Sequence, residues 1–253
     1  MGRGAHPSGA PCMNKRARIF SVLAVLPWIL AGLCLSEEQG GFEEEFRRMC
    51  RNPPAQGAWS EQERAWLKNN KEAIIALLLA DVRGGKLSPG SVGEGFRELL
   101  CGIGLAFLAD EAGAQKVLLE AFNNSWAQVQ LLDRTAMEQE KALKAASPDN
   151  FASLPTIIDH YENYRYEMAS FRNALVATAR QYKILLPQDR VWAMLAEGGA
   201  ATTCAVLYFL RFVDTDQAIK ERLLREYKDQ GEPRSKAYGH VAIRQWLDRP
   251  KSK

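Results

Sequence analysis

The sequence predicts an all-α protein, an antiparallel multi-helix bundle of about seven or eight helices with a long central helix. Apolar residues recur every three or four positions through most of the 253-residue chain. Residues 154–183 carry a pattern close to a heptad repeat, sustained over about four heptads. No segment bounded by turn residues alternates apolar and polar side chains as a strand would.

The first 36 residues are predicted to be a targeting segment and not part of the fold. Lys15, Arg16 and Arg18 precede the uncharged run 19–35, and polar residues follow it. A basic start, an apolar middle and a polar exit are typical of a secretory signal peptide. About 17 residues is also the lower limit for spanning a bilayer, so the second interpretation is an uncleaved membrane anchor. The third interpretation is that this run is a buried helix of the fold. We expect an extracytoplasmic protein, periplasmic or secreted, or one anchored in the membrane by residues 19–35.

The positive net charge of +3 belongs to this leader. Residues 1–36 contain four of the 33 basic residues and none of the 30 acidic ones, so the remaining chain is close to neutral. Its charge gives no support for a nucleic-acid partner. We expect a protein partner, and contact with a membrane only through an uncleaved N-terminal segment.

Three cysteines follow the leader, Cys50, Cys101 and Cys204. In an oxidising compartment they form at most one disulfide. A Cys50–Cys101 bridge is one of the three pairings that they allow. The other interpretation is that all three are unpaired, since Cys101 and Cys204 lie in apolar helical surroundings where a thiol behaves as a small hydrophobe.

The segment 37–58 is an acidic and proline-containing connector, with a short helix near residues 42–50. A capping-box pattern, Ser60 with Glu63, then begins a helix that ends at the glycines 84–85. The same spacing recurs at Ser91 and Glu94, where the next helix begins.

Two more features precede the central helix. Glycines at 102 and 104 weaken the helix that follows Glu94. A further helical pattern runs over residues 113–146, and a short turn follows at 147–153. We expect residues 59–248 to form one helical domain, with 147–153 as a sub-boundary and 249–253 as a basic tail.

The central helix is predicted over 154–183, with Ser153 as its N-cap and Pro155 in its first turn. At about 1.5 Å per residue it is too long to cover its apolar stripe alone and needs partner helices. The stripe consists of Leu154, Ile157, Tyr161, Tyr164, Met168, Phe171, Leu175, Ala179 and Tyr182. The opposite face contains Glu162, Tyr166, Ala169, Asn173 and Arg180.

A helical run at 188–213 follows, which Gly198 and Gly199 could kink. Residues 198–210 carry no charge, a length that suits a buried core helix better than a membrane span. Asp214 or Thr215 is expected to cap a shorter helix ending near residue 231, and a last helix spans 236–248.

Metal and cofactor motifs are absent from the sequence. Its three histidines, His6, His160 and His240, do not occur in H-E-x-x-H or E-x-x-H spacing, and there is no C-x-x-C pair. The glycines at 90–95 lack the residues of a P-loop. We therefore predict no metal site, no cofactor and no catalytic residue.

One constellation is a candidate binding site. His160, Tyr164 and Glu167 follow one another at i+4 and i+3, so they line one edge of the apolar stripe. They could form a hydrogen-bond chain at the border of the core, contact a binding partner, or transfer a proton.

The functional prediction is an exported helical binding or accessory protein of a cell-envelope assembly, without catalytic activity. The alternatives are an extracytoplasmic hydrolase with convergent carboxylates, such as Glu111, Glu120 or Glu167, and a membrane-anchored helical subunit.

Overall fold

The computed structural model describes residues 41–54, 58–84, 94–145, 154–229 and 238–247. The predicted leader, the turn at 147–153 and the tail at 249–253 lie outside these residues. The chain separates into two compact units, residues 1–48 and residues 49–253.

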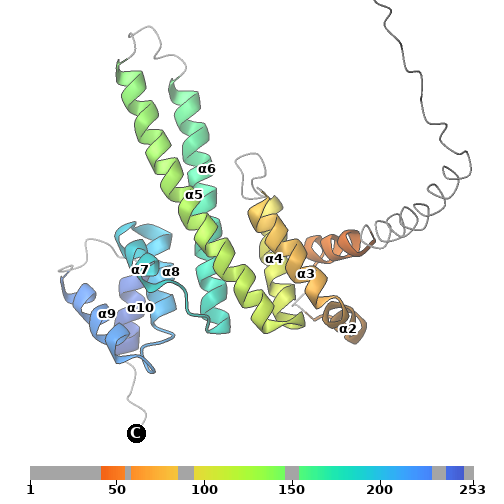
Figure 1. Ribbon diagram of the computed structural model, residues 1–253. Coiled ribbons are helices and arrows are strands. Elements are labelled where there is room, and N and C mark those ends of the chain that lie inside the picture. The colour runs from red at the N-terminus through yellow and green to blue at the C-terminus, as the bar shows by residue number, and fades with distance from the viewer. Residues whose placement is uncertain (1–40, 55–57, 85–93, 146–153, 230–237, 248–253) are drawn as a thin grey trace, which may run out of the picture. The chain divides into compact units, whose positions relative to one another are not determined.

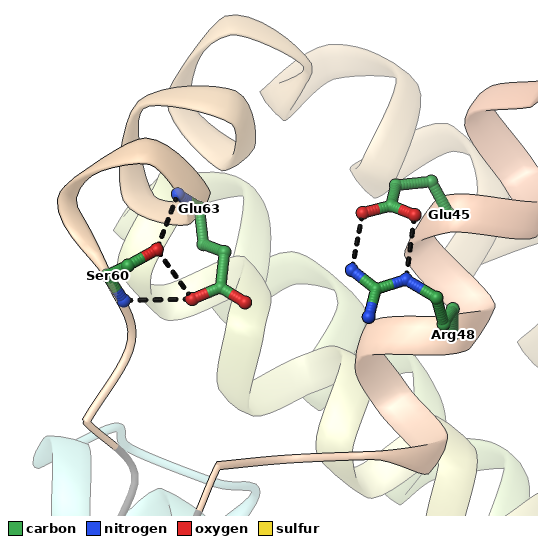
Figure 2. Close-up of polar contacts among 4 residues, drawn as sticks. All are labelled: Glu45, Arg48, Ser60 and Glu63. Carbon is green, nitrogen blue, oxygen red and sulfur yellow. Dashed lines mark hydrogen bonds and ion pairs between the residues drawn. The ribbon is translucent and has the colours of Figure 1, made fainter.

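Residues 41–51 are helical, which confirms the short helix predicted near 42–50. Phe42 and Phe46 stack one turn apart, with ring centroids separated by 6.3 Å. The Arg48 guanidinium donates to both carboxylate oxygens of Glu45, at 2.6 and 2.8 Å (Figure 2). Such pairs stabilise a helix because residues three and four apart share a face.

The described residues of the unit 49–253 form an all-α multi-helix bundle, as predicted, and contain no strand (Figure 1). The elements are α2 (Glu61–Asn69), α3 (Lys71–Arg83), α4 (Glu94–Ala109), α5 (Glu111–Ala145), α6 (Leu154–Tyr182), α7 (Gln188–Ala193), the 3₁₀ turn η3 (Met194–Ala196), α8 (Gly199–Phe209), α9 (Gln217–Asp229) and α10 (Tyr238–Leu247).

The predicted capping box opens α2 (Figure 2). The Glu63 backbone N–H donates to Ser60 Oγ at 3.2 Å, and the Ser60 backbone N–H donates to Glu63 Oε2 at 2.8 Å. The single helix predicted from Ser60 to Gly84 is wrong, however, because the chain breaks at Asn70 between α2 and α3. Asn70 leaves helical geometry (φ −107°, ψ 14°), and its side-chain amide donates to the Trp66 carbonyl at 2.8 Å. The side chain and the backbone N–H of Asn70 thus both donate to carbonyls in the last turn of α2, where the helix ends.

The predicted central helix is α6, which begins at Leu154 and ends at Tyr182. It packs against α5, α8 and α4. Among the described side chains of its apolar stripe, Tyr164, Met168, Phe171, Leu175 and Ala179 are buried. Stacked rings join it to α4, with centroids 4.8 Å apart for Phe96 and Phe171 and 3.8 Å apart for Phe107 and Tyr182. These contacts confirm that partner helices cover the stripe.

A tight turn follows α6. Lys183 adopts a left-handed conformation (φ 57°), and the Ile184 N–H donates back to the Ala179 carbonyl at 2.8 Å. The Tyr208 hydroxyl of α8 then accepts from the Leu186 N–H at 2.8 Å and donates to the Ile184 carbonyl at 3.2 Å. The turn is thereby attached to α8 through one buried phenol.

The helical run predicted at 188–213 is also interrupted. It consists of α7, η3 and α8, and the break falls at Gly198 (φ 84°) and Gly199 (φ 55°). The cap of α9 is Asp216, not Asp214 or Thr215, because its Oδ1 accepts from the N–H groups of Ala218 and Ile219 at 2.9 and 3.1 Å. Within the described ranges, none of the helices has the length and apolarity needed to cross a bilayer.

Candidate functional site

An open groove of about 560 Å³ lies along the outer side of α6. One wall comes from α6, and the other comes from Glu197 and the first turn of α8, with Val129 of α5 contributing. Gly198, the N-cap of α8, lies between η3 and α8 and itself lines the groove. Its lining is Val129, Glu162, Asn163, Arg165, Tyr166, Ala169, Ser170, Asn173, Glu197, Gly198, Ala200 and Ala201.

A buried cation is paired with a groove residue. The Arg172 side chain is fully buried, and its Nη2 donates to Glu197 Oε2, whose side chain is 34% exposed and lines the groove. The guanidinium also lies 5.3 Å from the centroid of the Trp126 ring, close enough for a cation–π contact. A buried charge is tolerated only when it is paired and hydrogen-bonded, so Glu197 holds both the charge balance and the position of Arg172.

The hydrogen bonds of this cluster are incomplete. The Arg172 Nε and Nη1 atoms are buried, and so are Glu167 Oε2 and Asn173 Oδ1, yet no described residue forms a hydrogen bond with any of these four atoms. Buried polar atoms usually have partners, and leaving one unsatisfied costs about 1–3 kcal/mol. These unsatisfied atoms therefore lower the stability of the folded state.

The wall of the groove also carries exposed groups. Tyr166 is 74% exposed, and Arg165 forms an ion pair with Asp133 of α5. Two other large apolar side chains on the neighbouring α5, Leu131 and Met137, are 56% and 55% exposed. The groove and its surroundings thus combine charges of both signs with accessible apolar surface.

Of the three residues of the predicted site, the structure describes the side chains of two, Tyr164 and Glu167. The His160 side chain lies outside the described residues. Tyr164 is in the core, where burial raises the pKa of its hydroxyl to about 12. Glu167 is half-buried with one orphaned oxygen. Neither Tyr164 nor Glu167 lines the groove, although both belong to the same helix as its wall.

The carboxylates considered for a hydrolase do not line this groove either. Glu120 of α5 forms an ion pair with Arg83 of α3. That hydrogen bond holds the pKa of Glu120 below its ordinary value, the opposite of what a general acid requires. Among the residues that the structure describes, no three His, Cys, Asp or Glu side chains gather in a way that could hold a metal ion.

Sequence reasoning missed Arg172, Glu197 and Tyr166 as site residues. Arg172 follows the stripe residue Phe171, and nothing in its spacing distinguishes a buried arginine from an exposed one. Tyr166 did carry a signal, because the helical period places this aromatic residue on the solvent side of α6.

The fold and the groove define an all-α bundle with a polar, open groove beside its central helix. Comparison with family models, with curated proteins and with solved structures gives no match for this chain.

Proposed function

We propose that this protein is an exported, non-catalytic helical protein that binds a protein partner in a cell-envelope assembly. The observation that carries the proposal is the groove beside α6 with Tyr166 74% exposed on its wall. Tyrosine supplies a large rigid surface at low entropic cost and is enriched among the residues that dominate interface energies. An open groove suits a protein segment better than a small molecule, which prefers an enclosed pocket.

The charges of the groove support a protein partner of mixed polarity. Glu162, Arg165 and Glu197 line it together with amide and hydroxyl groups. Charges of both signs give specificity through complementary pairing and little net attraction to a polyanion. The exposed Leu131 and Met137 on α5 supply apolar surface nearby in sequence to the groove residue Val129.

The test is site-directed photo-crosslinking in the native envelope fraction. A photoreactive phenylalanine analogue at position 166, and separately at Ala200 on the opposite wall, should capture the same protein. With the label at Ala200, Tyr166→Ala should lower the captured amount about tenfold, the effect of losing about 1.4 kcal/mol of binding energy.

A matched control uses Glu72, an exposed residue of α3 that does not line the groove. A label at position 72 should not capture the partner, and Glu72→Ala should not change capture from Ala200. Identical captures at positions 72 and 166, or different proteins captured from the two walls, would contradict the proposed interface.

Export is tested separately by mass spectrometry of the mature N-terminus from each cell fraction. A chain that begins near residue 37 in an extracytoplasmic fraction supports cleavage, and an intact residue 19–35 segment in the membrane fraction supports the anchored form. An intact chain in the cytosol contradicts export.

A further inference from the structure

Cys50 and Cys101 meet where residues 50 and 51 contact α4. A hydrogen bond joins the two thiol groups. One residue after Cys50, Arg51 Nε donates to Glu98 Oε2 at 3.3 Å. Because Glu98 and Cys101 are three apart on α4, they share a helix face, and both contacts join residues 50 and 51 to that face.

The two thiols differ in access. Cys50 is buried, with 5% of its surface exposed, whereas Cys101 is partly exposed. Cys204 of α8 is also partly exposed and provides an internal comparison.

The electrostatics favour the Cys101 thiolate. The hydrogen bond from Cys50 lowers the pKa of the Cys101 thiol, and this effect exceeds the opposing influences of burial and of the Glu98 charge. At Cys204 burial raises the pKa of the thiol, and the charges of Arg180 and Arg172 oppose that rise. The thiolate is the reactive form of cysteine, so Cys101 is the better nucleophile of the two accessible cysteines.

We propose that Cys50 and Cys101 form a reactive dithiol that closes to a disulfide and joins residues 49–51 covalently to α4. The oxidant is a disulfide of the thiol-exchange class, either a small molecule or an oxidoreductase. This contact selects one pairing from the three that the sequence allows. It uses no residue of the groove, so it holds or fails independently of partner binding.

The exchange proceeds in two steps. The Cys101 thiolate attacks one sulfur of the oxidant, so that a mixed disulfide forms, the oxidant's S–S bond breaks and one thiolate leaves. Cys50 then loses its proton to solvent and attacks the Cys101 sulfur, which forms the intramolecular bond and releases the second thiolate. Two cysteine thiols are oxidised, and one disulfide is reduced to two thiols.

The experiment uses the full chain with Cys12 and Cys34 replaced by serine, equilibrated with mixtures of reduced and oxidised glutathione. After acid quenching and alkylation, peptide mass spectrometry should find a Cys50–Cys101 link, with Cys204 still alkylated. The oxidised protein should have a higher urea midpoint than the reduced one, and dithiothreitol should reverse the rise.

Two variants separate the roles of the cysteines. Cys50→Ala should retain the glutathione adduct at Cys101, at about ten times the parent level, because the resolving thiol is gone. Cys204→Ser should behave as the parent, and the parent's own peptide map decides the pairing even if Cys50→Ala does not fold. A bond that includes Cys204, or a Cys101 adduct that never resolves onto Cys50 in the parent, would overturn the proposal.

Discussion

Single residues decide how closely the helices of this protein approach one another. Gly113, in the first turn of α5, faces Ile75 of α3. A Cβ added at Gly113 would lie 2.7 Å from Ile75 Cγ1 and 2.6 Å from Asp110 Oδ2. Gly104 in the middle of α4 has no such neighbour within 4 Å. Glycine thus allows a close helix–helix contact at position 113, whereas at position 104 it only weakens the helix.

We predict that Gly113→Ala destabilises the protein by about 1–3 kcal/mol, because the added methyl group overpacks the α3–α5 contact. Gly104→Ala should instead stabilise it by about 0.5–1 kcal/mol, the usual gain when alanine replaces glycine inside a helix. Urea unfolding of both variants measures the two free energies. Equal effects at the two positions would show that the close approach at Gly113 is not formed.

The buried Arg172 illustrates what residue spacing does not reveal. The period of α6 correctly assigned the buried side chains of Tyr164, Met168, Phe171, Leu175 and Ala179 and the exposed ones of Glu162, Tyr166 and Arg180. Ala169 and Asn173, which it placed on the exposed face, are half-buried. The period gave no means to foresee a fully buried guanidinium, because the counter-charge, Glu197, comes from a segment 25 residues later in the chain. Pairs of residues that meet only in the tertiary structure therefore could not be predicted from the sequence, and neither could the groove that Glu197 lines.

A helix boundary can be predicted from the sequence where a side chain forms a hydrogen bond with a backbone group a few residues away. The sequence predicted the start of α2 from Ser60 and Glu63, and it predicted both ends of α6 to within a residue. It missed the break at Asn70, and at Gly198 and Gly199 it foresaw a kink and not a break, because asparagine and glycine are tolerated inside a helix and also able to end one. Tertiary packing decides between those outcomes, and the periodic pattern continues across both breaks.

We predict that Ser60→Ala lowers the free energy of unfolding by about 0.5–2 kcal/mol, because the Glu63 N–H loses its acceptor. Glu61→Ala is the matched control, since Glu61 lies in the same first turn and does not take part in the capping box. Chemical denaturation followed by circular dichroism measures both. A larger loss for Glu61→Ala would mean that charge near the helix terminus, not the cap, holds α2.

At the scale of the whole molecule, α6 connects the N-terminal helices to the C-terminal ones through α5, α4 and α8. Its buried stripe contains Tyr164, whose pKa burial raises from 10.0 to about 12. Burial also raises the pKa of Tyr182 and of Tyr208. The folded state therefore favours the protonated phenols, and the unfolded chain releases these protons first.

The titration of Tyr164 should accordingly leave the stability unchanged below pH 10 and lower it as the pH rises from about 10 to about 12. The urea midpoint measured across this range should decline less steeply in Tyr164→Phe than in the parent, with Tyr182 and Tyr208 causing the remaining decline. Tyr166→Phe is the control, because that exposed ring keeps nearly the same surroundings on unfolding. A Tyr164→Phe slope equal to that of the parent would contradict the burial of this phenol.

Gly198, at φ 84° and ψ 176°, adopts a conformation that is essentially restricted to glycine. Because Gly198 and Gly199 have no Cβ atom, both can adopt positive φ angles, of 84° and 55°. Replacing Gly198 and Gly199 by alanine would keep every charged and aromatic side chain around the groove and still disfavour the backbone conformation that these two positions adopt. The backbone conformation at these two glycines, and not the chemistry of the lining side chains, is therefore the feature on which the shape of this surface beside α6 depends.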